Sequence, residues 1–337
     1  MVNGGYGETH VNTLLAALNI PCVSQKTLKN REREVGQQLG EMAEETCQKS
    51  LQEEIRLSEG SLSACFDGAW QKRGTGRAYN SLTGHASLFG EKSKKIISFS
   101  VKGKKCRICA AAKSKGNPPR VHQCCKNWTR SAKAMEPAMA CEMLEKVEMS
   151  GGKVDTLIMD NDSTTIARVK AQVNPNISKR SDSNHTKKGF TGALVELSSA
   201  HKVLRNVKVR GHMERCFMYC IQQNKDNPSQ LETDLRNIVP HLYGEHQSCG
   251  QWCKSQKTGY KPKHLPYGKP LSCTVLRTAL EDLFEKYSKK ASELSHIGST
   301  QKNENFNLMV SSKAPKRFSI RSWLSHRDSS QQSTQSD

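Results

Sequence analysis

Three short runs of apolar and β-branched residues, separated by polar turns, predict β-strands in the central part of the chain. Residues 62–66 are mostly apolar and lead directly into Asp67. Residues 78–89 form the second run, and residues 95–101 form a third that is rich in β-branched and aromatic side chains. Because charged or glycine-containing turns separate them, we expect an antiparallel meander with Asp67 at the end of its first strand.

A helix and a fourth strand follow this meander. Residues 131–149 place their apolar side chains at the spacing of an amphipathic helix, and a glycine pair ends it. Residues 154–159 then form an apolar strand that leads directly into Asp160. Three strands, a helix and a strand is the order of a ribonuclease H-like core, so we predict an α/β (α+β) fold with this core in residues 61–189.

The segments on either side of the core differ from it in pattern. Residues 1–60 have helical periodicity and predict an accessory helical segment. Residues 190–300 predict a mostly helical insertion. Its candidate helices are residues 204–224, 230–238 and 271–294. We expect residues 301–324 to form the final core helix region, and residues 325–337, rich in Ser, Gln and Thr, to form a disordered tail.

The composition favours a polyanionic partner and excludes several classes of protein. The chain has 337 residues, with 52 Lys and Arg against 32 Asp and Glu, and its formal net charge is +20. No stretch approaches the ~20 apolar residues of a membrane-spanning helix, and the N-terminus lacks the apolar core of a signal peptide. We therefore expect a soluble, intracellular chain without a membrane partner, and the composition excludes a collagen or a coiled coil.

Positive charge is concentrated in residues 61–135, which hold sixteen Lys and Arg but only two acids, Asp67 and Glu91. A solvated surface is the simpler explanation for a run of charge. Because each neutralised phosphate releases counterions, the same concentration favours binding to a nucleic-acid backbone. The expected DNA contacts are Lys72, Arg73, Lys102, Lys104 and Lys105.

Cysteines and histidines with the spacing of metal ligands occur twice in the chain, which has thirteen cysteines. In the first cluster, Cys106 and Cys109 are separated by twelve residues from His122 and Cys124, in a loop at residues 104–126. Three thiolates and one imidazole with a tight first pair are a typical ligand set for tetrahedral zinc. The sequence therefore predicts a structural Zn²⁺ in this loop.

The ligand assignments leave alternatives open in both clusters. Cys125 is an alternative fourth ligand in the first, and a CxxC pair in a Lys-rich loop can also be incidental or redox-active. The second cluster consists of His241, His246, Cys249 and Cys253. Its spacing is compatible with a second zinc site, and burial of its cysteines as core thiols is the alternative.

Three acidic residues suit the chemistry of cutting DNA. Phosphoryl transfer uses two divalent cations about 3.5 to 4 Å apart, and carboxylates must hold them. Asp67 and Asp160 each follow a predicted strand, and pairing within one sheet brings strand ends together. Glu304 is the candidate for the third acid. Taken singly, an aspartate after a strand is more often an ordinary turn residue.

Residues 66–74 (FDGAWQKRG), with residues 82–85 (LTGH) behind them, strongly resemble the first catalytic block of the Mutator-like transposases of animal genomes. Further blocks resemble this family in the same order, and together they span residues 10–320. These blocks are residues 106–109 (CRIC), 122–124 (HQC), 127–128 (NW), 131–136 (SAKAME), 160–163 (DNDS), 246–253 (HQSCGQWC), 303–304 (NE) and 315–317 (PKR).

The resemblance implies a ribonuclease H-like fold with a DDE carboxylate triad that cuts and joins DNA strands using Mg²⁺ or Mn²⁺. Carried over by position, Asp67 is the first acid, Asp160 the second and Glu304 the third. Asp162 is the rival for the second position, because the family motif also has two aspartates there. Asp160 is preferred because it directly follows the apolar strand.

The resemblance also implies roles for other residues and for partners. Asp182 and His185 are similar to an Asp-x-x-His element that this family places on the next strand of the core, with a structural role or a contact to DNA. A surface histidine is the alternative. The implied partners are transposon terminal repeats and target DNA, the active complex is expected to be a homo-oligomer, and the expected location is the nucleus.

The predicted function is a Mutator-like DDE transposase that binds DNA and cuts and joins strands by metal-dependent phosphoryl transfer. A catalytically inactive, transposon-derived zinc- and DNA-binding protein is the alternative. This alternative is based on the C-terminal part of the chain, where only 33 residues follow Glu304 and the family's further helix is expected to be missing. A nuclease of the same fold would use the same metals but has no motif of its own in this chain.

Overall fold

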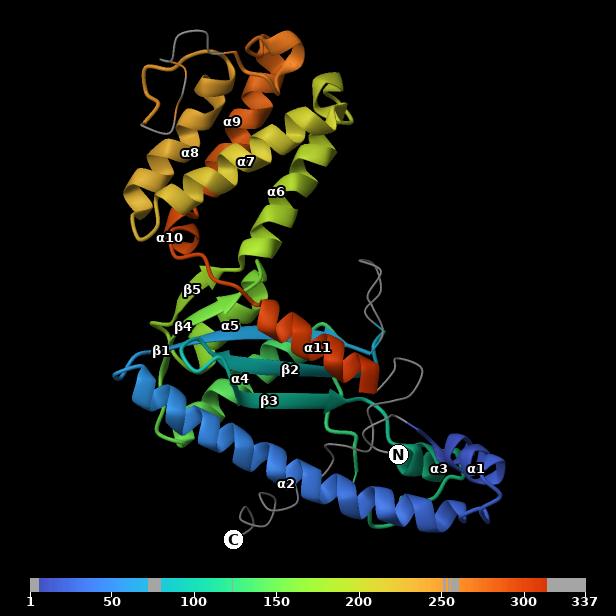
Figure 1. Cartoon of the computed structure of the whole chain (residues 1–337). Coiled ribbons are helices and arrows are strands. Elements are labelled where there is room, and N and C mark those ends of the chain that lie inside the picture. The colour runs from blue at the N-terminus through green and yellow to red at the C-terminus, as the bar shows by residue number, and fades with distance from the viewer. Residues whose placement is uncertain are drawn as a thin grey trace. The chain divides into compact units, whose positions relative to one another are not determined.

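The chain is a mixed α/β protein that divides into two compact units (Figure 1). The structure, a computed structural model, describes residues 6–71, 80–122, 124–250, 253, 255 and 261–313. The first unit comprises Met1–Leu157, Asp162–Ser178 and Thr300–Asp337, and the second comprises Ile158–Asn161 and Lys179–Ser299.

A five-stranded sheet has the strand order β3-β2-β1-β4-β5. Its strands are β1 (Leu62–Trp70), β2 (Thr83–Gly90), β3 (Ile96–Gly103), β4 (Val154–Met159) and β5 (Ser178–Ser181). β2 pairs antiparallel with both β1 and β3, so the predicted meander is confirmed. β5 has the polar sequence SKRS and no apolar pattern, so the residue pattern predicted no strand there, and only the family resemblance implied a further strand, at residues 182–185.

The first strand is longer than predicted, which places Asp67 inside the strand instead of after it. β1 continues to Trp70, which pairs with Gly84, and Asp67 lies opposite Ser87. The predicted position of Asp67 at a strand end is therefore wrong. Pairing with β2, and not the apolar run of residues 62–66, determines where β1 ends.

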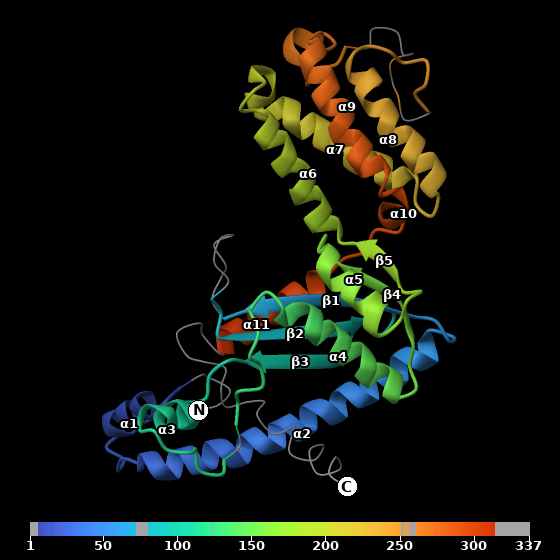
Figure 2. The same cartoon turned by 180° about the vertical axis from the view of Figure 1, so that it is seen from behind.

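Some helices of the first unit cover the two faces of the sheet. The helices of this unit are α1 (Glu8–Ala17), α2 (Gln25–Leu57), α3 (Arg107–Ser114), α4 (Met135–Met149), α5 (Ser163–Gln172) and α11 (Gln301–Lys313). α11 lies in front of the sheet in Figure 1 and α4 in front of it in Figure 2, so the two helices lie on opposite faces. On the α4 face, a Cβ added at Gly68 would lie 3.6 Å from Glu136. On the α11 face, Phe306 packs edge-on against Phe89 with ring centroids 6.1 Å apart.

Helix α2 attaches the N-terminal part of the chain to the sheet. The side chain of Ser24 caps its first turn by accepting a backbone hydrogen bond. Near the other end, Glu54 is fully buried and accepts hydrogen bonds from the backbone N–H groups of Lys92, at 2.9 Å, and Ser93, at 2.6 Å. α2 therefore holds the turn between β2 and β3, so these residues belong to the same unit as the sheet.

The second unit is mostly helical and has its own apolar core. Its helices are α6 (Ser183–Leu197), α7 (Val207–Gln223), α8 (Pro228–Leu242), α9 (Thr274–Ser288) and α10 (Ala291–Leu294), with short 3₁₀ turns at η2 (Lys202–Arg205) and η3 (Pro266–Gly268). Phe190 stacks on Phe217 at the centre of this core, with ring centroids 4.1 Å apart. The predicted boundary at residue 190 falls inside α6, because the face of α6 that carries Phe190 packs with the other helices.

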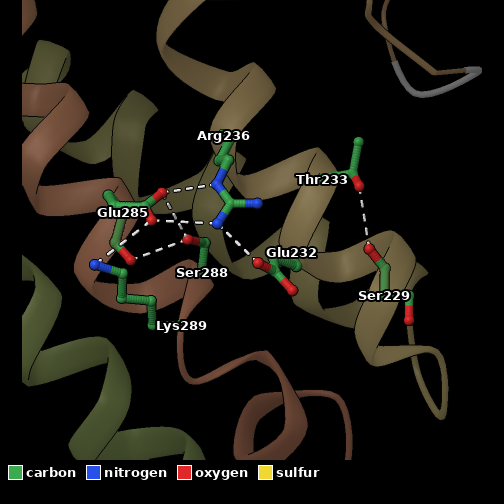
Figure 3. Close-up of polar contacts among 7 residues, drawn as sticks. All are labelled: Ser229, Glu232, Thr233, Arg236, Glu285, Ser288 and Lys289. Carbon is green, nitrogen blue, oxygen red and sulfur yellow. Dashed lines mark hydrogen bonds and ion pairs between the residues drawn. The ribbon is translucent and has the colours of Figure 1, made fainter.

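An exposed ion-pair network joins α8 to α9 (Figure 3). The guanidinium of Arg236 contacts both carboxylate oxygens of Glu285, at 2.7 and 3.2 Å, and also pairs with Glu232 at 2.7 Å. The hydroxyl of Ser288 donates to Glu285 at 3.1 Å. Hydrogen bonding from Arg236 lowers the pKa of Glu285 to about 2. This two-point contact links α8 and α9 at the surface, beside the apolar core to which both helices contribute.

Two further expectations concern membrane-spanning helices and the C-terminal residues. Within the described ranges, no helix is long and apolar enough to cross a bilayer. The predicted final core region begins with α11, while residues 314–324 and the predicted disordered tail at 325–337 lie outside the described residues.

Candidate functional site

Asp67 is held by an asparagine from α11. It is half-buried in β1, and the side-chain Nδ2 of Asn307 donates a 2.8 Å hydrogen bond to its Oδ2. One turn earlier on the helix, Nδ2 of Asn303 contacts the carbonyl oxygens of Ser87, at 2.9 Å, and Cys65, at 3.1 Å. Two asparagines four residues apart therefore dock α11 onto β1 and β2, and the second of them contacts the first predicted acid.

Glu304, the predicted third acid, lies on this same helix. It is half-buried and directly follows Asn303, and its backbone N–H donates to the carbonyl of Thr300 at 3.0 Å. Asn307 comes three residues later, within one helical turn. Asp67 and Glu304 are therefore carried by two elements, β1 and α11, that contact each other directly through the Asn307 side chain.

A histidine of β2 completes the polar group around Asn307. His85 is buried, and its Nε2 lies 3.1 Å from the Oδ1 of Asn307. Burial lowers the pKa of His85, and the hydrogen bond with Asn307 opposes this shift. Sequence reasoning missed Asn307, although a helix with two asparagines and Phe306 on one face already indicates a polar face that needs partners in the protein.

In the second unit, Asp160 directly follows β4, as predicted. The Nδ1 of His185 lies 3.7 Å from its Oδ2. Asp182 is 1% exposed, and its carboxylate accepts a 2.7 Å hydrogen bond from the backbone N–H of His185. Its own N–H donates to the carbonyl of Met159 at 2.9 Å. The Asp-x-x-His pair therefore does not lie on a strand: it follows β5 and forms the first turn of α6, which brings His185 to Asp160.

Asp162, the rival for the second acid, acts as the N-cap of α5. Its Oδ1 accepts from the N–H of Thr164 at 3.0 Å, and its Oδ2 accepts from the N–H and the hydroxyl of Thr165 at 3.2 and 2.6 Å. Burial alone would raise the pKa of Asp162, but these hydrogen bonds lower it. Because both carboxylate oxygens bind the helix end, Asp162 has a structural role that accounts for its position.

The first Cys/His cluster is positioned by the end of β3. Asn127 anchors the returning loop there: its Oδ1 accepts from the N–H of Gly103 at 2.7 Å, and its Nδ2 donates to the carbonyl of Val101 at 2.9 Å. Cys106 follows three residues after the strand and precedes α3. The loop therefore leaves β3 and returns to it, which brings its two halves together.

The four predicted ligands of this cluster converge. Nε2 of His122 lies 3.2 Å from the Sγ of Cys106 and 3.4 Å from that of Cys109, and the Sγ atoms of Cys109 and Cys124 lie 3.5 Å apart. Ligand atoms around tetrahedral zinc are about 3.3 to 3.8 Å apart. Cys125 instead donates its thiol hydrogen to the carbonyl of Lys105 at 3.4 Å. Cys106, Cys109, His122 and Cys124 therefore form a group that can hold a metal ion.

Two features of this cluster suit a cation. The Nδ1 of His122 lies 2.6 Å from the carbonyl of Arg120, which fixes the proton on Nδ1 and leaves the Nε2 lone pair directed at the thiols. Burial opposes ionisation of Cys106, but hydrogen bonds from the backbone N–H groups of Cys109 and Ile108 lower the pKa of its thiol to about 6. A thiolate is the form in which cysteine binds a metal.

The second Cys/His cluster is built at the end of α8. His241 lies in the last turn of the helix, the chain reverses at Gly244, whose φ is +85°, and His246, Cys249 and Cys253 follow. The distances from the Sγ of Cys253 to the Nδ1 atoms of His241 and His246 are 3.4 and 3.5 Å. The four side chains form a second group that can hold a metal ion.

The predicted DNA-contacting cations differ in their surroundings. Lys102 is largely buried and pairs with Glu142 of α4 at 2.5 Å, so its position in β3 is accounted for by this ion pair. Lys104 is half-buried and Lys105 is exposed, both in the segment between β3 and the first cluster. Lys72 and Arg73 lie outside the described residues.

These features define an α/β protein with a carboxylate and its polar partners on the sheet and two Cys/His groups able to hold metal ions. The family model of the Mutator-like transposases matches residues 1–253, so the chain belongs to the Mutator-like transposase family. The match includes Asp67, Asp160 and both Cys/His clusters, while Glu304 lies beyond it. No curated protein and no solved structure matches the chain.

Proposed function

We propose that the chain is a DDE-type transposase, which binds DNA and cuts and joins its strands by metal-dependent phosphoryl transfer. Asp67, Asp160 and Glu304 are its catalytic carboxylates in this proposal. Membership of the Mutator-like transposase family suggests a transposase-related function. The observation that carries the catalytic proposal is the hydrogen bond from Asn307 to Asp67, because it fastens the helix that bears one proposed acid to the strand that bears another.

The proposal includes a ribonuclease H-like core. The antiparallel meander of β1, β2 and β3 and the strand order β3-β2-β1-β4-β5 support it, as do helices on both faces of the sheet. In a core of this kind the central strands carry the catalytic acids, and Asp67 lies within β1 while Asp160 follows β4.

Carboxylate oxygens are the ligands that Mg²⁺ prefers, so the three acids fit this cation. When bound, Mg²⁺ would lower the pKa of an attacking water and neutralise charge on the phosphate. Asn307 holds the carboxylate of Asp67 in one orientation. His185 lies beside the carboxylate of Asp160 and would orient it or contact the DNA phosphate.

We further propose that each Cys/His cluster binds a structural Zn²⁺. Both consist of four thiol or imidazole donors with no carboxylate, which is typical of closed structural zinc sites. In the first cluster, zinc would fix the loop that carries Lys104 and Lys105 beside the end of β3. In the second, it would hold the chain that follows α8.

DNA is the proposed partner, in the form of transposon terminal repeats and target DNA. The net charge of +20 supports an electrostatic attraction to the phosphate backbone. Lys104 and Lys105, with Lys72 and Arg73, are the proposed contacts, whereas the ion pair of Lys102 with Glu142 favours a structural role for that lysine. A homo-oligomeric active complex and action in the nucleus complete the proposal.

The test is strand nicking and strand transfer by the purified chain, in Mg²⁺ or Mn²⁺, on duplex DNA that carries the inverted repeats flanking its coding region. We expect cleavage by the wild type and its loss in Asp67→Asn, Asp160→Asn and Glu304→Gln. Asp155→Asn is the matched control, since Asp155 lies on β4 and pairs with Lys153 at 3.7 Å. DNA binding without cleavage by the wild type would overturn the catalytic proposal and favour the non-enzymatic alternative.

A further inference from the structure

We propose that Asn307 is a positioning residue for the proposed active site, holding the carboxylate of Asp67 in the orientation that binds a divalent cation. The inference rests on the proposed function, since it assumes that Asp67 is a metal ligand. It adds a residue that acts through Asp67 and is not itself one of the three acids.

The hydrogen-bonding pattern around Asn307 is determined by chemistry. An ionised carboxylate only accepts hydrogen bonds, so the atom of Asn307 that lies 2.8 Å from Oδ2 of Asp67 must be the amide nitrogen. The amide oxygen then faces the Nε2 of His85 at 3.1 Å, and because this oxygen only accepts, the hydrogen of the imidazole lies on Nε2. His85, Asn307 and Asp67 are therefore linked in series by two hydrogen bonds.

The surroundings restrict the conformations of these three hydrogen-bonded side chains. His85 and Asn307 are 7% and 9% exposed, and the Nδ1 of His85 has no hydrogen-bond partner in the described part of the chain. Rotating the Asn307 amide by 180° would set its oxygen against the carboxylate and its NH₂ group against the N–H of His85. Both hydrogen bonds would be lost, so the observed orientation is strongly favoured.

The helix itself is anchored independently of Asp67. Asn303 is fully buried and binds the carbonyl oxygens of Cys65 and Ser87, and Phe306 packs against Phe89. Removing the Asn307 amide should therefore leave α11 docked and change mainly the orientation of Asp67. Asn303, in contrast, has contacts that only hold the helix on the sheet.

This difference gives a test in which metal affinity and fold stability are separated. Mn²⁺ binding to the full-length chain is measured from the electron paramagnetic resonance signal of the free ion, and stability is measured as the thermal midpoint. The variants are Asn307→Ala and Asn307→Leu, the second of which keeps most of the side-chain volume. Asn305→Ala is the matched control, because Asn305 is an exposed asparagine on the same helix. Asn303→Ala is the control for helix docking.

We expect both Asn307 variants to bind Mn²⁺ about tenfold to a hundredfold more weakly, as for other groups that orient a metal ligand. Asn305→Ala should bind like the wild type, and Asn303→Ala should have a lower thermal midpoint with the wild-type affinity. Asp67→Asn, whose side-chain oxygen still accepts from Asn307, should lose the site.

The outcomes separate the two proposals. Weaker binding in Asp67→Asn together with wild-type binding in both folded Asn307 variants overturns the positioning role alone. Equal binding in the wild type and Asp67→Asn overturns both the metal site of the proposed function and the role of Asn307. Weaker binding in Asn303→Ala equal to that in the Asn307 variants would show a general effect of helix docking, and would also overturn the positioning role.

Discussion

The Nδ1 atoms of His241 and His246 lie 3.2 Å apart, in a group of four ligand atoms that all lie within 4.8 Å of one another. A single shared proton would satisfy this pair but not the thiols of Cys249 and Cys253, which lie 3.5 and 3.4 Å from the Nδ1 of His241. A cation bound among the four side chains would be a partner for both imidazoles and both thiols. Burial and the neighbouring His246 lower the pKa of His241 to about 4, so its imidazole is neutral at pH 7, as a metal ligand must be.

The first prediction is that the second cluster holds a zinc ion. Elemental mass spectrometry of the purified chain should find zinc at both groups, and Cys249→Ser or Cys253→Ser should lose the zinc of one group and lower the thermal midpoint. Cys273→Ser is the control, since Cys273 is exposed and belongs to neither group. Equal zinc content in the wild type and both cluster variants would show that the four residues are only core thiols and histidines.

A second prediction resolves the adjacent cysteines of the first cluster. Cys124→Ser should release the zinc of this loop, because its Sγ lies 3.5 Å from that of Cys109 and belongs to the convergent group. Cys125→Ser should keep it, because Cys125 contacts the carbonyl of Lys105. The measurement is zinc content per chain. Loss in Cys125→Ser with retention in Cys124→Ser would reverse the assignment.

The sequence alone predicted those features that depend on local pattern. The strands at β2, β3 and β4 and the helix α4 follow from apolar and β-branched runs bounded by glycine and charge. The Cys/His groups follow from spacing along loops. Features that depend on long-range pairing were not predictable in this way. The extension of β1 through Gly68 and Ala69, residues that favour strands poorly, depends on its pairing with β2.

The environment of Asp67 shows the same limit at the site. Its partner Asn307 is 240 residues away in the chain, and no local pattern connects the two. The sequence predicts Glu304 as the third acid, one helical turn before the asparagine that the structure brings to Asp67. Asn303 and Asn307 lie at i and i+4 on the helix face that also carries Phe306, and a buried amide requires hydrogen-bond partners in the protein.

A third prediction separates the two aspartates after β4. Asp162→Ala should lower the free energy of unfolding by about 0.5 to 2 kcal/mol, because it removes the N-cap of α5. Asp160→Asn should leave stability nearly unchanged and abolish DNA cleavage. Chemical denaturation and the cleavage assay together provide the check. A stable Asp162 variant that has lost cleavage, beside an active Asp160 variant, would make Asp162 the second acid.

The fourth prediction concerns the lysines near the first cluster. The double variant Lys104→Ala/Lys105→Ala should weaken DNA binding about equally on all sequences and reduce the slope of log affinity against log salt by about 2. Lys102→Ala should instead lower the thermal midpoint, since it leaves Glu142 without its closest cation. Lys26→Ala/Lys29→Ala, two exposed lysines of α2, is the charge-matched control. An unchanged salt slope in the double variant would exclude Lys104 and Lys105 from the DNA contact.

The central claim is that Asp67 is a catalytic carboxylate of a DNA-cutting enzyme. Its most direct test is the rate of Mg²⁺-dependent nicking of DNA carrying the terminal repeats, compared between the wild type and Asp67→Asn at equal DNA occupancy. The substitution removes one negative charge and keeps an oxygen that accepts from Asn307, so the fold and DNA binding should persist. We predict nicking by the wild type and none by Asp67→Asn. Nicking at the same rate by both proteins would contradict the account.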